Sequence, residues 1–126
     1  MQEVCSDFNG YLAEINSEQE YNFILKFLKS KVETEEASDA VLGASNNNTE
    51  EEWRYLQSGD PLNWVSWTRV TRGSSHHCMW IVWNRNDEGL HQYYCDVGWD
   101  DLARVVCEVD TGKCKLVYLS TYEFIP

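Results

Sequence analysis

The stretch from Cys78 to Glu108 constrains the fold of this chain more than any other. It contains two apolar runs, Cys78–Trp83 and Val105–Cys107, and three of the five cysteines of the chain: one at the start of the first run, one at the end of the second, and Cys95 between them. A run that is apolar at nearly every position is typical of a strand buried on both faces. We therefore expect the two runs to form central strands, separated by a polar turn and a loop.

Length and charge exclude several classes of protein. A chain of 126 residues is sized for one domain with a single core. With 10 basic and 21 acidic residues its formal net charge is −11, which disfavours non-specific attraction to nucleic acid or anionic lipid. No apolar run approaches the length that crosses a bilayer. We therefore expect no nucleic-acid partner and no membrane span.

The cysteines and the first residues point to different compartments. Five cysteines in so short a chain favour an oxidising compartment and a disulfide framework. The segment Met1–Val4 has neither the basic start nor the following apolar stretch of a signal peptide. We give the cysteines more weight, because a leader is lost from a gene model more easily than paired cysteines arise by chance. The prediction is an extracellular, secreted protein.

One helix and several strands follow from local patterns. Ser17–Glu20 forms a capping box, and apolar residues recur after it at helical spacing, so we expect a helix over about 18–30 packed on a sheet. Its apolar stripe consists of Tyr21, Phe23, Ile24, Leu25, Phe27 and Leu28. A turn and a short strand are predicted at Gly10–Ile15, and a strand is predicted at Val41–Ala44. A hairpin is predicted from Trp53–Leu56 and Leu62–Trp67 around a turn at Ser58–Pro61. The acidic segment Lys31–Asp39 and the polar segment Thr68–His77 are expected to be loops.

These residues together resemble the C-type lectin-like domains, particularly the invertebrate forms. The resemblance covers residues 1 to about 109 and rests on Cys5, Gly10–Ser17, Glu20, Val41–Ala44, Trp53–Tyr55, Ser58–Leu62, Trp67, Cys78, Cys95 and Val106–Glu108. It implies an α+β fold with two helices flanking antiparallel sheets, a long loop on the upper sheet, and a lower sheet that joins the chain ends. It also implies two disulfides, Cys5–Cys107 and Cys78–Cys95. Cys114 has no partner in the family pattern, and is either free or joins a second chain in a disulfide-linked dimer.

Both ends of the chain depart from the family pattern. The family domain begins upstream with a strand that pairs with the final strand, whereas this chain opens inside the first helix. We therefore expect an N-terminally truncated domain over 1–109 and a C-terminal tail over 110–126. Residues 115–124 are β-prone, so the tail either turns back at 110–112 to pair with the strand ending at Cys107 or stays disordered.

The resemblance also implies where a calcium ion would bind if the ligands were present. The family holds a sugar-bridging calcium ion with an acidic loop triplet and an Asn-Asp pair, and these align here with Thr71–Gly73 and His91–Gln92, which supply no carboxylate. Calcium sites normally include two or more carboxylates, yet residues 61–86 contain no Asp or Glu. The remaining candidates, Asp87, Glu88, Asp96, Asp100 and Asp101, follow that loop. We therefore expect no cofactor and no calcium at the usual sugar site.

The same loop is basic in an otherwise acidic chain. Three arginines give residues 61–86 a local charge of +3, while the rest of the chain carries −14. Arginine matches carboxylate or sulfate with two parallel hydrogen bonds, so this face can bind an acidic glycan or an acidic protein surface. The alternative is that these are ordinary solubilising residues. The candidate ligand-binding residues are Arg69, Arg72, His76, His77 and Arg85, with Trp64 and Trp67 packed beneath them.

Two other site types are disfavoured. A zinc site built from His76, His77 and Cys78 with His91 and Cys95 would need adjacent histidines on one side of an extended chain, and both cysteines have a better use in a disulfide. No recognisable signature joins a nucleophile, a base and an orienting group, so the chain is not expected to be an enzyme. Asn47–Thr49 is a sequon that predicts N-glycosylation at Asn47.

We therefore predict an extracellular carbohydrate-binding recognition domain that works without calcium and binds a glycan or a cell-surface glycoprotein. The alternative is a protein-binding or structural module of the same fold with no sugar binding. Fold alone does not decide between them.

Overall fold

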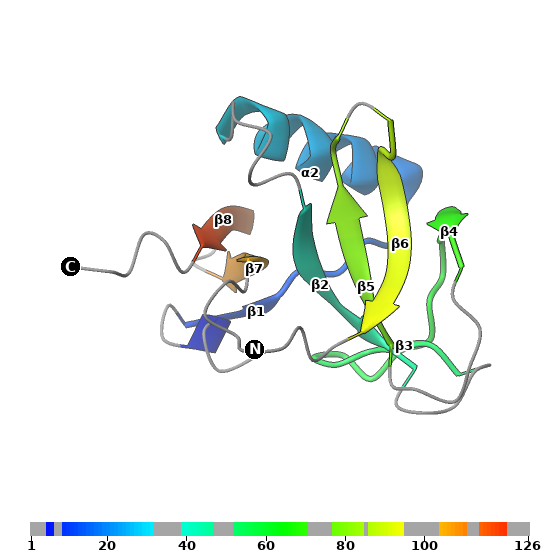
Figure 1. Cartoon of the computed structure of the whole chain (residues 1–126). Helices are drawn as coiled ribbons and strands as arrows, with labels where there is room; N and C mark the ends of the chain where they lie inside the picture. The colour runs from blue at the N-terminus through cyan, green and yellow to red at the C-terminus, as the bar shows by residue number, and fades with distance from the viewer. Residues whose placement is uncertain are drawn as a thin grey trace.

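The computed structural model describes residues 5–6, 9–31, 39–46, 52–70, 77–84, 86–94, 104–110 and 114–120. The elements in this part of the chain are β1 (Gly10–Leu12), α2 (Glu18–Lys31), β2 (Asp39–Ser45), β3 (Arg54–Tyr55), β4 (Trp67–Arg69), β5 (His77–Val82), β6 (Gly89–Tyr94), β7 (Arg104–Asp110) and β8 (Cys114–Ser120). Figure 1 shows α2 lying across the strands β2, β5 and β6. The predicted α+β class is confirmed.

The strands form one connected, mostly antiparallel sheet. Its order is β1-β7-β2-β5-β6-β4, with β3 paired to β2 and β8 paired to β7. Two pairings are parallel, β2 with β7 and β4 with β6. The described residues form two apolar clusters, the larger combining α2 with β2 and β5, and the smaller surrounding Cys5 and Cys107.

Helix α2 begins where the capping box places it. The Ser17 hydroxyl accepts a hydrogen bond from the Glu20 backbone N–H at 3.1 Å, which satisfies one of the free donors of the first turn. Ile24, Leu25 and Leu28 are buried, as their spacing predicts. Phe23 is 64% exposed, so its assignment to the buried stripe was wrong.

The first apolar run is a buried strand, as predicted, but the interpretation of the segment after it was incomplete. β5 starts at His77 and lies between β2 and β6, with five consecutive buried residues. The segment expected to be only a turn and a loop contains β6, which pairs with β5 from Val82↔Gly89 to His77↔Tyr94. The second run lies in β7, next to β1 and β2.

The predicted hairpin is correct at its turn and wrong at its second strand. Tyr55 donates its backbone N–H to the Asp60 carbonyl at 2.9 Å, and Arg54 forms a bridge with Pro61. The next strand is β4, which pairs with β6 rather than with β3. The segment Thr68–His77, expected to be a loop, is therefore strand at both of its ends, while 71–76 lie outside the described residues.

Strand β8 comes from the predicted tail. It pairs antiparallel with β7 at seven positions, from Arg104↔Ser120 to Asp110↔Cys114. β1 and β2 pair with successive segments along one edge of β7. β8 therefore pairs with the opposite edge of β7. The pairing alternative for the tail is therefore the one observed, while the division of the chain into 1–109 and 110–126 stays a prediction.

One disulfide ties the start of the described chain to β7. Cys5 and Cys107 are bonded, as the family resemblance implied, and both are fully buried. Cys5 and Ser6 have helical conformation, and the rest of the expected first helix lies outside the described residues. Cys78 is disulfide-bonded as well, but Cys95 is not described, so the second pairing stays a prediction.

The short segment after β1 is held tightly between two strands. Ala13 donates its N–H to the Val106 carbonyl at 2.9 Å and accepts the Gly43 N–H at 2.8 Å. A Cβ on Gly43 would lie 2.6 Å from the Leu12 carbonyl oxygen, so only glycine fits at this position of β2. This close packing fixes the path of residues 13–16 before α2 starts.

Candidate functional site

The described part of the arginine-containing loop centres on Arg69, at the end of β4. Its side chain is 62% exposed and forms an ion pair with Asp87. The parallel pairing of β4 with β6 brings these two residues together, although Asp87 lies 18 positions further along the chain. The hydrogen bond from Arg69 holds the pKa of the Asp87 carboxyl below its ordinary value. Arg69 therefore has a fixed neighbour and an accessible guanidinium.

The other predicted ligand residues are either outside the described part of the chain or buried. Arg72, His76 and Arg85 lie outside the described residues, as does the sequon residue Asn47. His77 is only 1% exposed, and its backbone N–H donates to Asn46 Oδ1 at 2.9 Å. The His77 side chain therefore lies in the interior at the start of β5 and is not available to a ligand at the surface.

Trp64 and Trp67 lie near β4, and their packing beneath the whole loop face stays a prediction. Both are half-buried and pack against the larger apolar cluster. Trp67 lies 4.8 Å from Trp53 between ring centroids, and Trp64 lies 5.7 Å from Tyr21. The backbone that carries Arg69 is thus anchored by large side chains.

Residues at the aligned calcium positions have other contacts. Gln92 is buried, and His91 Nε2 lies 2.7 Å from the Asp87 carbonyl oxygen. Thr71–Gly73 are not described. In the described ranges, no group of three or more His, Cys, Asp or Glu side chains could hold a metal ion. The expectation of no calcium at the usual sugar site stays a prediction.

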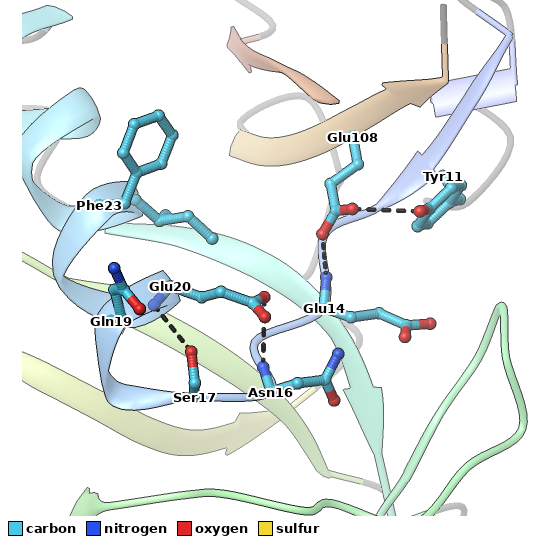
Figure 2. A pocket seen from close by; sticks show the side chains of 9 residues that line it. Tyr11, Glu14, Asn16, Ser17, Gln19, Glu20, Phe23 and Glu108 are labelled. Carbon is cyan, nitrogen blue, oxygen red and sulfur yellow. Dashed lines mark hydrogen bonds between the residues drawn. The ribbon is translucent and has the colours of Figure 1, made fainter. Parts of the chain in front are cut away.

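A groove of about 580 Å³ lies between the first turns of α2 and the strands β1 and β7. Figure 2 shows its walls: Glu20 and Phe23 project from α2, Glu108 from β7 and Tyr11 from β1. The described residues that line it are Tyr11, Glu14, Asn16, Ser17, Gln19, Glu20, Phe23, Ile24 and Glu108. Three of these residues are acidic, and none is basic.

Glu108 is a half-buried carboxylate of this groove. Its Oε1 accepts the Glu14 backbone N–H at 2.9 Å and its Oε2 accepts the Tyr11 hydroxyl at 3.1 Å (Figure 2). Burial raises the pKa of Glu108 above its ordinary value, and the negative charges of Glu14 and Glu20 raise it further. The two hydrogen bonds act in the opposite direction but do not cancel the increase.

Comparison with known families decides the classification. The sequence model of the family described as "Lectin C-type domain" matches residues 1–119, most of the chain. The chain belongs to the C-type lectin family. Domains of this family are binding modules, so the prediction that the chain is not an enzyme is confirmed. Such domains are typically extracellular, and no helix among the described residues is long and apolar enough to cross a membrane.

Solved structures confirm the C-type lectin fold. The carbohydrate-recognition domain of mouse scavenger receptor C-type lectin is 21% identical, with a TM-score of 0.55 over 75% of this chain and 71% of that chain. Human lithostathine is 16% identical, with a TM-score of 0.61 over 75% and 66%. A calcium-independent type II antifreeze protein is 21% identical, with a TM-score of 0.53 over 75% and 66%. No curated protein sequence matches the chain.

The groove of this C-type lectin domain was not predicted from the sequence. Glu20 was predicted to cap the helix, and both Glu20 and Glu108 belong to the family pattern. The groove forms because β1 pairs with β7 so that Tyr11 lies opposite Glu108. Residue type alone does not indicate that register, since the two residues are 97 positions apart. A polar residue in an apolar strand, Glu108 after Cys107, was the one available signal.

Replacing Glu108 with glutamine is expected to change how stability depends on pH. Because the folded protein raises the Glu108 pKa, the folded state binds more protons there than the unfolded state does. Wild-type stability therefore falls as pH rises from the ordinary glutamate pKa through the raised one. A glutamine side chain does not titrate, so the variant should match the wild type at low pH and become relatively more stable at neutral pH.

Urea unfolding of both proteins at a series of pH values measures this difference. Glu18→Gln, which removes an exposed glutamate of α2 outside the groove, controls for the loss of one negative charge. A constant free-energy difference between the wild type and the Glu108 variant across the acidic range would contradict the assignment.

Proposed function

We propose that this C-type lectin domain is an extracellular carbohydrate-binding module that recognises acidic glycans without calcium through the loop face around Arg69. The observation that carries the proposal is the exposed guanidinium of Arg69 at the end of β4. It belongs to a stretch of the chain, residues 61–86, with three arginines and no acidic residue. A local positive charge in a protein of net charge −11 favours anionic ligands at this face.

The ion pair with Asp87 is compatible with this role. A guanidinium has five N–H donors, and Asp87 accepts through Oδ1 from one nitrogen, Nη2. The remaining donors can bind a carboxylate or sulfate of a glycan, while Asp87 restricts the direction in which Arg69 points. Arg72, His76 and Arg85 belong to the same loop face in this proposal. His77 is left out of it because it is buried.

The calcium-independent part of the proposal rests on the aligned residues. Thr71–Gly73 and His91–Gln92 offer no carboxylate where the family pattern has its calcium ligands. Relatives with this fold include both a "carbohydrate-recognition domain" and a "calcium-independent" antifreeze protein, so the fold accommodates both kinds of site. A direct contact between arginine and an acidic sugar would need no bridging metal ion.

A second candidate function is protein binding or a structural role with no sugar binding. It is favoured by the Arg69–Asp87 ion pair, which neutralises part of the loop charge. It is also consistent with the antifreeze protein among the structural relatives. This candidate predicts saturable binding to a protein partner and no preference among glycans.

A glycan array tests the proposal. The wild-type domain should retain sulfated or carboxylated glycans equally in calcium and in chelator. Arg69→Ala together with Arg72→Ala should reduce that retention about tenfold or more, because it removes two charge-assisted contacts. The matched control, Lys26→Ala with Arg54→Ala, removes two exposed cations from α2 and β3 and should retain binding.

The outcomes separate the alternatives. Retention that disappears in chelator would show that a metal ion bridges the sugar, and would overturn the calcium-independent mechanism. An equal loss of glycan retention in both double variants would indicate that the glycans bind by non-specific attraction to positive charge. Absence of any glycan retention would leave the protein-binding candidate.

We further propose that the chain is secreted, with Cys78 bonded to Cys95, Asn47 glycosylated, and Cys114 either free or linked to a second chain. Each proposal rests on the sequence, and for Cys78 also on its observed disulfide bond. Peptide mapping of the secreted, non-reduced protein identifies the partner of each cysteine and the mass at the sequon.

A further inference from the structure

The groove between α2, β1 and β7 has a charge opposite to that of the arginine-containing loop. The described residues that line it include Glu14, Glu20 and Glu108 and no lysine, arginine or histidine. An occupant with positive charge would complement these walls, and an anionic one would be repelled.

Local hydrogen bonds fix the three carboxylates in place. Glu14 Oε2 accepts the Ser58 backbone N–H at 3.1 Å, and Glu20 Oε2 accepts the Asn16 N–H at 3.4 Å. Glu108 is held by Glu14 N–H and by Tyr11. A carboxylate has about four acceptor sites, so each of the three retains capacity for a further donor. Burial raises the Glu108 pKa, and a cation placed beside the carboxylate would lower it again.

An apolar surface borders the carboxylates. Phe23 is 64% exposed although it is a large aromatic residue, and Ile24 and the Tyr11 ring complete the apolar part of the lining. In Figure 2 the Phe23 ring stands at the rim of the groove, on the α2 side. A lysine or arginine side chain combines an apolar stem with a cationic head, which matches this combination of walls.

We propose that the groove is a docking site for a basic segment of a protein partner. A lysine or arginine of that segment places its stem against Phe23 and its cationic head among Glu14, Glu20 and Glu108. The cavity volume of about 580 Å³ suits a short peptide segment, because ligands of drug size occupy comparable cavities. This site shares no residue with the proposed glycan-binding face, so either proposal can fail without the other.

Fluorescence anisotropy with two labelled, end-blocked hexapeptides tests the docking site. One peptide carries two lysines, and the matched peptide carries glutamine at both positions. The lysine peptide should bind the wild-type chain, and the glutamine peptide should bind at least about fivefold more weakly. Spermidine serves as a small cationic probe that lacks a peptide backbone.

Three variants test whether the lysine peptide binds in the groove. Glu14→Gln with Glu20→Gln removes two charges and leaves one acceptor oxygen on each side chain, and should weaken binding of the lysine peptide about tenfold. Its matched control, Glu18→Gln with Glu52→Gln, removes two exposed charges outside the groove and should change affinity less than about twofold. Phe23→Ala leaves the net charge unchanged and should weaken binding about threefold. Because Phe23 is exposed, this variant should fold normally even if the double variant does not.

The proposal is overturned if the control pair weakens binding as much as the groove pair, because binding would then follow net charge alone. It is also overturned if the glutamine peptide binds as tightly as the lysine peptide. Binding of spermidine without binding of the lysine peptide would assign the groove to small amines rather than to a protein segment. Unchanged affinity in Phe23→Ala would place the peptide elsewhere.

Discussion

Replacing Cys5 and Cys107 together with alanine should lower the free energy of unfolding by about 4 to 5 kcal/mol. The bond joins residues 102 positions apart, so it restricts nearly the whole unfolded chain. Both cysteines are fully buried in the smaller apolar cluster, and alanine avoids placing a hydroxyl there. The loss would be a large part of the roughly 5 to 15 kcal/mol that stabilises a typical domain.

Urea denaturation followed by tryptophan fluorescence measures this change, with the slope against urea checked for two-state behaviour. Cys78→Ala with Cys95→Ala is the matched comparison, because it opens a predicted loop of fewer than twenty residues. Chain entropy gives that loop about 3 kcal/mol. A larger loss from the short loop than from the long one would contradict the entropic explanation.

The elements that the sequence predicted are those in which burial and local pattern agree. The start of α2 was predicted from the Ser17 hydroxyl and from the spacing of Ile24 and Leu28. In the structure Ser17 caps the helix, and Ile24 and Leu28 are buried. β5 is apolar from Cys78 to Val82, and β2 and β6 pair with its two edges. Local signals suffice where no distant partner has to be identified.

Strand β6 shows why other elements were missed. Its alternation is regular, with Leu90 and Gln92 buried and Tyr93 exposed. A polar glutamine occupies a buried position, however, so the segment lacks the apolar alternation that indicates a strand. Its pairing with β5, rather than its composition, makes it a strand.

The charges of the candidate sites depend on pairings that the sequence does not specify. Residues 61–86 contain no acidic residue, yet Asp87 lies against Arg69 because β4 and β6 are parallel neighbours. The acidic groove likewise depends on the register of β1 with β7. The charges along the chain therefore predicted the basic loop. They did not predict the ion pair of Arg69 with Asp87 or the acidic lining of the groove.

Tyr55→Phe should cost about 2 to 4 kcal/mol although it removes a single oxygen atom. The Tyr55 hydroxyl donates to the Ile15 carbonyl and accepts the Ile15 N–H at 3.0 Å, in a fully buried position. Burial contributes most to raising the pKa of this phenol to about 12, so it stays protonated in ordinary buffers. Phenylalanine keeps the ring packing but leaves both Ile15 backbone groups without this partner.

Thermal and urea unfolding of Tyr55→Phe should be compared with Tyr11→Phe, which removes a half-buried hydroxyl bonded to the Glu108 carboxylate. The Tyr11 variant should lose about 1 kcal/mol or less, because water can replace that contact. Since Ile15 lies two residues before the α2 cap at Ser17, the Tyr55 variant should also weaken lysine-peptide binding in the groove. Equal losses of stability in the two variants would show that the Ile15 backbone finds other partners, and that Tyr55 does not hold this segment in place.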